Sequence, residues 1–216
     1  MTRICLSVLP VDDTLPNLIK RICAKKPDLI EYRLDYLTKS SALETIAENK
    51  RCPIIAADRS RRKQARGLLL SAAEIGFDII DVDISCSFAR SIIRQLKVLD
   101  VQVITSHHDS IRTPPETKLI RLLQTERKLG GDICKIVTTA NRPIDNLVVL
   151  GFINKYSRTA KIVSFAMGKL GVTSRVLSPL FGAEFTFACI DNHSKTAEGQ
   201  TSIDDLRQMW KKLEIA

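Results

Sequence analysis

Lys135 is the residue whose surroundings most clearly indicate chemistry. It lies between Ile133-Cys134 and Ile136-Val137, in an apolar run that predicts a buried strand. A lysine is almost never fully buried without a partner or a purpose, and burial and nearby cations both favour the neutral amine. The neutral amine is the form that attacks a carbonyl to make an imine. The position therefore predicts a Schiff-base nucleophile, and a lysine snorkelling from an edge strand is the structural alternative.

His108 is the second candidate for chemistry. Two of the three histidines, His107 and His108, precede Asp109 at the end of an apolar run. An imidazole near its reference pKa is suited to moving a proton at neutral pH. Adjacent side chains on an extended segment point apart, so a metal site built from these three residues is the less favoured hypothesis. His107 and His193 are expected to be ordinary polar residues.

Three arginines are candidates for binding a carboxylate. Arg33, Arg59 and Arg175 could form a bidentate clamp, although Glu31 and Asp35 could instead balance their charges. The segment 167–175 carries two glycines after an apolar run. Such a loop lets the backbone approach a ligand closely and would place Arg175 over it, whereas an ordinary turn explains the glycines equally well.

The elements that must position these side chains follow a repeated pattern. Short apolar runs predict strands at residues 4–8, 29–34, 53–57, 79–84, 101–106, 132–137, 161–165 and 184–188. Amphipathic stretches predict helices at residues 14–24, 41–49, 64–75, 87–97, 116–129, 144–156 and 203–213, the last opening at Thr201 with Asp204 three residues on. Alternating strands and helices imply parallel strands with right-handed crossovers.

Eight such strands favour an α/β fold of the (β/α)₈ TIM-barrel class, with an open doubly wound sheet as the alternative. No G-x-G-x-x-G turn follows the first strand, which disfavours dinucleotide binding. Strands buried on both faces should be almost wholly apolar. Here Glu31, Asp81, Asp83, His108 and Lys135 lie in or beside the strands, most of them near the carboxyl ends, where a barrel places its active site.

The bulk composition fits one globular domain over residues 1–216. The chain is 44% hydrophobic and 26% charged, and its length suits a compact barrel. The amino-terminal sequence does not have the pattern of a secretory signal, and no apolar run is long enough for a membrane span, so a cytoplasmic protein without a membrane partner is expected. The six scattered cysteines are expected to be buried, reduced thiols.

The net charge of +9 raises the possibility of nucleic-acid binding. The only dense basic cluster covers residues 59–63, and aromatic residues make up 5% of the chain. A stacking platform for single strands is therefore not expected.

The chain resembles the type I 3-dehydroquinate dehydratases over essentially its full length. The matching blocks, in order, are Glu31-Tyr-Arg33-Leu-Asp35, Pro53-Ile-Ile with Arg59, Asp81-Val-Asp83, Ser106-His107-His108-Asp109, Asp132-Ile-Cys-Lys135-Ile, Met167-Gly-x-x-Gly-x-x-Ser-Arg175, Phe185-Thr-Phe-Ala188 and Ala197-Glu-Gly199-Gln200. A single block would be weak evidence for the family, but the whole set of blocks, in this order, is specific to it.

The resemblance implies a carbon–oxygen lyase of the shikimate pathway of aromatic amino-acid biosynthesis. It would convert 3-dehydroquinate to 3-dehydroshikimate without metal or organic cofactor. Lys135 would form the imine, His108 would be the general acid and base, and Arg175 would hold the substrate carboxylate. The remaining substrate-binding residues would be Glu31, Arg33, Arg59, Thr196 and Gln200, and the family suggests a homodimer. The segments 167–175 and 196–200 look like a lid that excludes water.

Two positions depart from the family pattern. Many relatives carry a glutamate four residues beyond the arginine that Arg59 matches, where it orients the histidine, and this chain has Lys63 there. The group that orients His108 is therefore left open. The late loop commonly reads Ser-Ala-Pro-Gly-Gln, whereas here Thr196 keeps the hydroxyl and Glu198 replaces the proline, a change that bears on loop stiffness.

Two other functions remain as alternatives. A class I aldolase acting on a phosphorylated sugar would share the strand lysine but should have a phosphate site near the last strands. The segment 181–191 has no glycine-rich phosphate cradle beyond Gly182. A basic nucleic-acid-binding module would instead show binding with a steep salt dependence and would form no imine.

Overall fold

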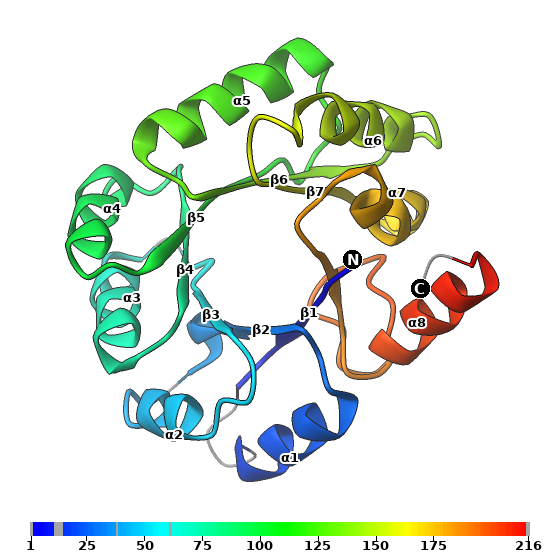
Figure 1. The fold of residues 1–216 in the computed structure, drawn as a ribbon. Coiled ribbons are helices and arrows are strands. Elements are labelled where there is room, and N and C mark those ends of the chain that lie inside the picture. The colour runs from blue at the N-terminus through cyan, green and yellow to red at the C-terminus, as the bar shows by residue number, and fades with distance from the viewer. Residues whose placement is uncertain (1, 11–14, 38, 61, 215–216) are drawn as a thin grey trace.

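The computed structural model describes residues 2–10, 15–37, 39–60 and 62–214, and it forms a (β/α)₈ barrel with its helices in a ring outside the strands (Figure 1). This confirms the predicted fold class. The strands are β1 Ile4–Val8, β2 Leu29–Arg33, β3 Ile54–Ala57, β4 Ile79–Asp83, β5 Gln102–His108, β6 Ile133–Thr139, β7 Ile162–Met167 and β8 Thr186–Ala188. The helices are α1 Leu15–Lys25, α2 Ala42–Glu48, α3 Lys63–Ile75, α4 Ala89–Val98, α5 Glu116–Leu129, α6 Asp145–Tyr156, α7 Val172–Leu177 and α8 Ile203–Lys212.

All neighbouring strands that are hydrogen-bonded run parallel. The order is β7-β6-β5-β4-β3-β2-β1-β8, so β1 pairs with both β2 and β8. The seam between β7 and β8 has no strand pairing, but the Glu184 N–H donates to the Ile162 carbonyl at 2.8 Å just before β8 begins. The eight strands therefore enclose one interior.

Apolar side chains fill the barrel interior on the amino-terminal side of the polar residues. One buried cluster lines the inside, with members from all eight strands or the residues beside them: Cys5, Leu29, Ile55, Ile79, Ile104, Ile133, Val137, Val163, Phe165, Phe185 and Phe187. Two further clusters lie between strands and helices, and the larger includes Trp210 of α8, whose indole N–H donates to the Val176 carbonyl at 2.9 Å. The packed floor closes the interior from below, and the barrel interior is open toward the carboxyl ends of the strands.

Three aspartates fix the strands at the opposite, amino-terminal end. Each precedes an even-numbered strand, and its Oδ2 accepts from a backbone N–H in the odd-numbered strand before it. The pairs are Asp28 with Ile4 at 2.8 Å, Asp78 with Ile54 at 2.9 Å, and Asp132 with Val103 at 2.7 Å. We call these three contacts the strand clasps. Because a slip of one residue would turn every side chain to the other face, the clasps help to hold the register that aims the polar residues inward.

One ionisable side chain is buried away from the open end. Glu126 of α5 is fully buried, and neither carboxylate oxygen has a hydrogen-bond partner among the described residues. Burial raises the pKa of Glu126 well above its usual value, by more than the neighbouring Cys134 thiol and the Lys135 peptide group lower it. Glu126 is therefore a neutral acid on the outer side of the strand that carries Lys135.

The structure corrects several sequence expectations in detail. The segment after β7 is not only a loop: a 3₁₀ turn at Lys169–Gly171 leads into α7, so Arg175 is helical. Helix α8 is capped by Ser202, whose hydroxyl accepts from the Asp205 N–H at 3.1 Å, rather than by Thr201 with Asp204. Cys5, Cys134 and Cys189 are buried free thiols as expected, but Cys23 is exposed because it lies on the outer face of α1.

No helix in the described ranges is both long enough and apolar enough to cross a membrane.

Candidate active site

The strands change from apolar to polar two residues beyond the packed floor. Side chains two apart on a strand point to the same side, so Leu29 is followed inside the barrel by Glu31, and Ile133 is followed by Lys135. Together these positions border a cavity of about 400 Å³ at the carboxyl end of the strands. All eight candidate site residues line it: Glu31, Arg33, Arg59, His108, Lys135, Arg175, Thr196 and Gln200.

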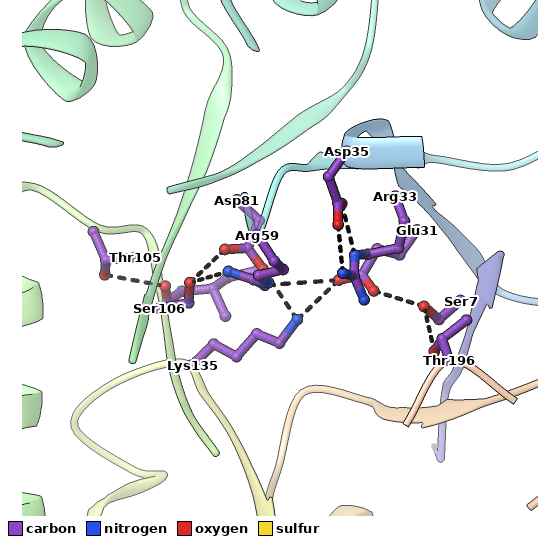
Figure 2. A network of polar contacts seen from close by, with 11 residues as sticks. Ser7, Glu31, Arg33, Asp35, Arg59, Asp81, Thr105, Ser106, Lys135 and Thr196 are labelled. Atoms are coloured by element: carbon purple, nitrogen blue, oxygen red, sulfur yellow. Dashed lines mark hydrogen bonds and ion pairs between the residues drawn. The ribbon is translucent and has the colours of Figure 1, made fainter. Parts of the chain in front are cut away.

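Lys135 lies at the floor of this cavity between two carboxylates (Figure 2). Its Nζ donates to Glu31 Oε2 at 2.9 Å and to Asp81 Oδ2 at 3.0 Å, and it lies 4.1 Å from the centre of the Phe187 ring. The side chain is 4% exposed, which excludes a lysine snorkelling from an edge strand. Both carboxylates accept their hydrogen bonds from Nζ, so the nitrogen that would attack a carbonyl is held between two anions.

Arg59 and Ser106 hold Asp81 from the other side. Arg59 Nη2 donates to Asp81 Oδ2, Arg59 Nη1 donates to the Ser106 hydroxyl at 2.7 Å, and Ser106 donates to Asp81 Oδ1 at 2.6 Å (Figure 2). Burial raises the pKa of Asp81, but Arg59 and then Lys135 lower it by more, so that the net pKa lies far below the usual value. Asp81 is therefore a permanent anion that fixes two cations.

Glu31 is bonded on its other oxygen to a hydroxyl. Ser7 Oγ donates to Glu31 Oε1 at 2.8 Å, and the Thr196 hydroxyl donates to Ser7 Oγ at 3.1 Å (Figure 2). Arg59 Nη2 lies 4.0 Å from Glu31 Oε2. A hydrogen-bonded chain thus runs from the loop after β8 through the first strand to the carboxylate beside Lys135.

Arg33 is already paired within its own segment. Its Nε and Nη2 donate to Asp35 Oδ1 at 2.9 Å and to Asp35 Oδ2 at 2.7 Å, and its guanidinium lies 5.5 Å from the Tyr36 ring centre. Asp35 therefore balances the charge of Arg33, which was the alternative left open by the sequence. Because Arg33 still lines the cavity, its remaining N–H groups are available there.

His108 enters the same cavity from β5 as a neutral imidazole. Its Nδ1 is buried and has no hydrogen-bond partner within the described part of the chain. Burial, and after it the charges of Arg59 and Lys135, lower the pKa of His108 well below 6.5. A neutral imidazole at pH 7 can accept a proton.

Arg175 is a buried cation without a counter-ion. It is 1% exposed, Nε and Nη2 have no partner among the described residues, and its guanidinium lies 4.1 Å from the centre of the Phe165 ring. Burial lowers the pKa of Arg175 to about 10. An uncompensated buried charge is costly, and a planar guanidinium facing a cavity is suited to a bidentate carboxylate or phosphate.

Two loops meet over the cavity. The Gly168 N–H donates to the Glu198 carbonyl at 3.3 Å, and Gln200 Oε1 accepts from the Thr196 backbone N–H at 2.8 Å. Gln200 Oε1 also lies 3.0 Å from the Thr196 hydroxyl, whose single proton it shares with Ser7 Oγ. Gly199 has a φ of +74°, and a Cβ there would lie 2.2 Å from the Gly168 carbonyl oxygen. Only glycine fits this contact without displacement, so the two loops are joined at that point.

The remaining polar side chains clarify what the sequence left open. Asp81 and Ser106 belong to sequence blocks that match the family, but no role was predicted for either, and Ser7 gave no signal because serine is unremarkable in a strand. Lys63 is the first residue of α3 and is exposed, and it is not among the residues that line the cavity. No cluster of three or more histidine, cysteine or acidic side chains suited to a metal occurs among the residues that the structure covers.

Comparison with known proteins identifies the family. The family model for type I 3-dehydroquinase matches residues 4–216. The chain belongs to this family. A 3-dehydroquinate dehydratase of Methanocaldococcus jannaschii is 30% identical over 227 residues, covering 98% of this chain and 99% of the relative. One from Shouchella clausii is 31% identical over 214 residues, covering 88% and 83%.

Solved structures agree with this assignment. The crystal structure of 3-dehydroquinate dehydratase from Geobacillus kaustophilus superposes with a TM-score of 0.88 at 25% identity, covering 99% of this chain and 91% of that one. As a member of the type I 3-dehydroquinase family, the chain is a lyase that dehydrates 3-dehydroquinate in the shikimate pathway.

Proposed function

We propose that this dehydratase works through a covalent imine between Lys135 and the ketone of 3-dehydroquinate, with His108 moving the protons. The observation that carries the proposal is a buried lysine at the floor of a cavity that also holds a neutral histidine and an unpaired arginine. A cationic imine withdraws electrons, so the neighbouring carbon–hydrogen bond becomes more acidic.

His108 then removes that proton onto its ring nitrogen. The electron pair of the broken bond moves toward the iminium, the hydroxyl on the next carbon leaves, and His108 returns the proton to it, so that water departs. Hydrolysis of the imine releases 3-dehydroshikimate and restores the lysine amine. The low pKa of His108 suits the accepting step, because the imidazole is neutral when substrate arrives.

Arg175 is assigned to the substrate carboxylate. Its two unpartnered nitrogens lie against the cavity, and a carboxylate would supply the charge that the protein does not. Glu31, Arg33, Arg59 and Gln200 are assigned to the ring hydroxyls, and Thr196 joins them from the loop. The joined loops at Gly168 and Gly199 would exclude water from the imine.

A compact catalytic domain over residues 1–216 and a cytoplasmic location complete the proposal on the grounds of composition and sequence pattern. A homodimer is added on the ground of the family resemblance. The proposed binding partner is the small-molecule substrate, which the cavity would hold. The proposed reaction requires neither a nucleic acid nor a membrane.

Borohydride trapping tests the mechanism. The wild type incubated with 3-dehydroquinate and reductant should gain one covalent adduct by intact mass, and peptide mapping should place it on Lys135. Lys135→Ala should gain none, while its circular dichroism stays that of the wild type. A folded wild type that dehydrates the substrate but never gains an adduct would exclude the imine. Carbon–carbon cleavage of a phosphorylated sugar with imine trapping would instead support an aldolase.

A further inference from the structure

The resting contacts of Lys135 leave one step of the proposed mechanism without an assigned group. Its Nζ donates to Glu31 at 2.9 Å and to Asp81 at 3.0 Å. An ammonium has no lone pair and cannot attack a ketone. The proton must therefore pass to a group in contact with Nζ, and among the described residues the two carboxylates make those contacts (Figure 2).

Asp81 is poorly suited to take this proton. Both of its oxygens are occupied, Oδ1 by the Ser106 hydroxyl and Oδ2 by Arg59 and Lys135. Loss of the lysine charge would leave Arg59 in place, and a guanidinium does not release its proton in this range. Asp81 would therefore remain a paired anion after Lys135 becomes neutral.

Glu31 differs in the number of cations that face it. Among the described residues Lys135 is the only cation hydrogen-bonded to it, Arg59 Nη2 lies 4.0 Å from its Oε2, and Ser7 is a neutral donor on the other oxygen. The carboxyl is 4% exposed and also faces the carboxylate of Asp81. When Lys135 loses its charge, burial and the charge of Asp81 both favour a protonated Glu31, while the Ser7 hydrogen bond and the more distant charges of Arg59 and Arg33 oppose it.

We propose that Glu31 accepts the ammonium proton of Lys135 and returns it to the substrate ketone oxygen as that oxygen leaves as water. This inference rests on the imine mechanism and adds a proton-transfer role to the substrate contact assigned to Glu31. The transfer neutralises a buried ion pair, so no net charge is created in the cavity.

The protons balance through the whole step. Lys135 gives one proton to Glu31, and the amine then adds to the carbonyl carbon through the nitrogen lone pair. A second nitrogen proton passes to the new alkoxide oxygen, and Glu31 returns the first proton to the resulting hydroxyl. The carbon–oxygen bond breaks, so ammonium and ketone become iminium and water.

Ser7 is a positioning residue in this scheme. Its hydroxyl donates to Glu31 Oε1 and accepts from Thr196, which leaves Oε2 turned toward Nζ. The loop that carries Thr196 therefore helps to orient the carboxyl through Ser7.

Rapid-quench borohydride trapping separates this role from substrate binding. With saturating 3-dehydroquinate at pH 7, Glu31→Gln should form the adduct about 10²–10⁴-fold more slowly than the wild type, the range for losing a positioned acid–base group. The rate should recover as the pH is raised, because hydroxide then removes the ammonium proton. Ser7→Ala should slow the adduct about 10-fold, the effect of one hydrogen bond. Arg33→Gln, a change in a cavity residue bonded to neither group, should weaken binding without this pH dependence.

Binding is measured apart from imine formation by titrating substrate into Lys135→Met and into Lys135→Met combined with Glu31→Gln. If saturated Glu31→Gln forms the adduct at the wild-type rate at pH 7, Glu31 only binds substrate and the inference is overturned. If the wild type itself forms no adduct, the imine mechanism fails instead.

Discussion

Replacing the buried acid of α5 with a methionine should stabilise the protein. Glu126 is fully buried with two unpartnered carboxylate oxygens. Leaving a buried polar group unsatisfied costs about 1–3 kcal/mol. Methionine follows the same unbranched path and removes the polar atoms, so Glu126→Met should gain about 2 kcal/mol. For a chain of this size that is a rise in Tm of about 4–8 °C.

The gain should also depend on pH. The folded pKa of Glu126 is raised above the ordinary value, which is about 4.3 in the unfolded chain. Below that pH the carboxyl is protonated in both states and its ionisation changes nothing. Above it the unfolded chain releases the proton and the folded chain keeps it, so wild-type stability falls as the pH rises toward the folded pKa. The advantage of Glu126→Met should widen by up to about 1.4 kcal/mol per pH unit.

Urea unfolding of wild type, Glu126→Met and Glu126→Gln at pH 5 and pH 7 provides the assay. The glutamine variant cannot ionise but keeps its polar atoms, so it should lose the pH-dependent part and gain little at pH 5. If Glu126→Met is less stable than the wild type, or if its advantage is the same at both pH values, then Glu126 is satisfied or ionised in the folded protein and the reasoning is wrong.

Three further outcomes follow from the site. Arg175→Lys should raise KM about 10–100-fold in steady-state assays, since each lost hydrogen bond to a charged group is worth about 1.5–3 kcal/mol; an unchanged KM would place the carboxylate elsewhere. Because the pKa of His108 is lowered, the acid limb of the kcat/KM profile should lie below pH 6.5, and Arg59→Gln should move it upward; a limb at or above 6.5 would contradict this. Gly199→Ala, whose Cβ would meet Gly168, should cut kcat/KM about 100-fold with Tm nearly unchanged, whereas wild-type activity would show that the loops need not meet.

The barrel, and the place of Glu31 and Lys135 inside it, were predictable because both depend on strand periodicity. An apolar run interrupted by an acid or a lysine places that side chain inside a closed barrel. Strand ends were predicted to within a few residues for the same reason, and β1 matches its predicted bounds. Helix α7 was missed because it spans six residues and directly follows a segment with two glycines, so it has little amphipathic pattern of its own.

The counter-ions of the site were not predictable in the same way. The sequence indicated that Lys135 would be buried, but not that two carboxylates would accept hydrogen bonds from its Nζ. Those partners lie 104 and 54 residues away along the chain. Ser7 is similarly linked to a hydroxyl 189 residues away. Contacts of this kind depend on barrel closure, which no local pattern encodes.

The strand clasps divide the chain into repeated building units. Asp28, Asp78 and Asp132 recur about 50 residues apart, and each ties one odd-numbered strand to the next strand along the chain. Each of the three units β1–β2, β3–β4 and β5–β6 therefore carries its own contact that holds the register, whereas β7 and β8 have none of this kind among the described residues. Fragments that end between units keep each of these contacts, whereas fragments that end within a unit lose one. At the amino-terminal end of the barrel, each clasp connects only two neighbouring strands. At the carboxyl end, the cavity is lined by residues from most of the strands together.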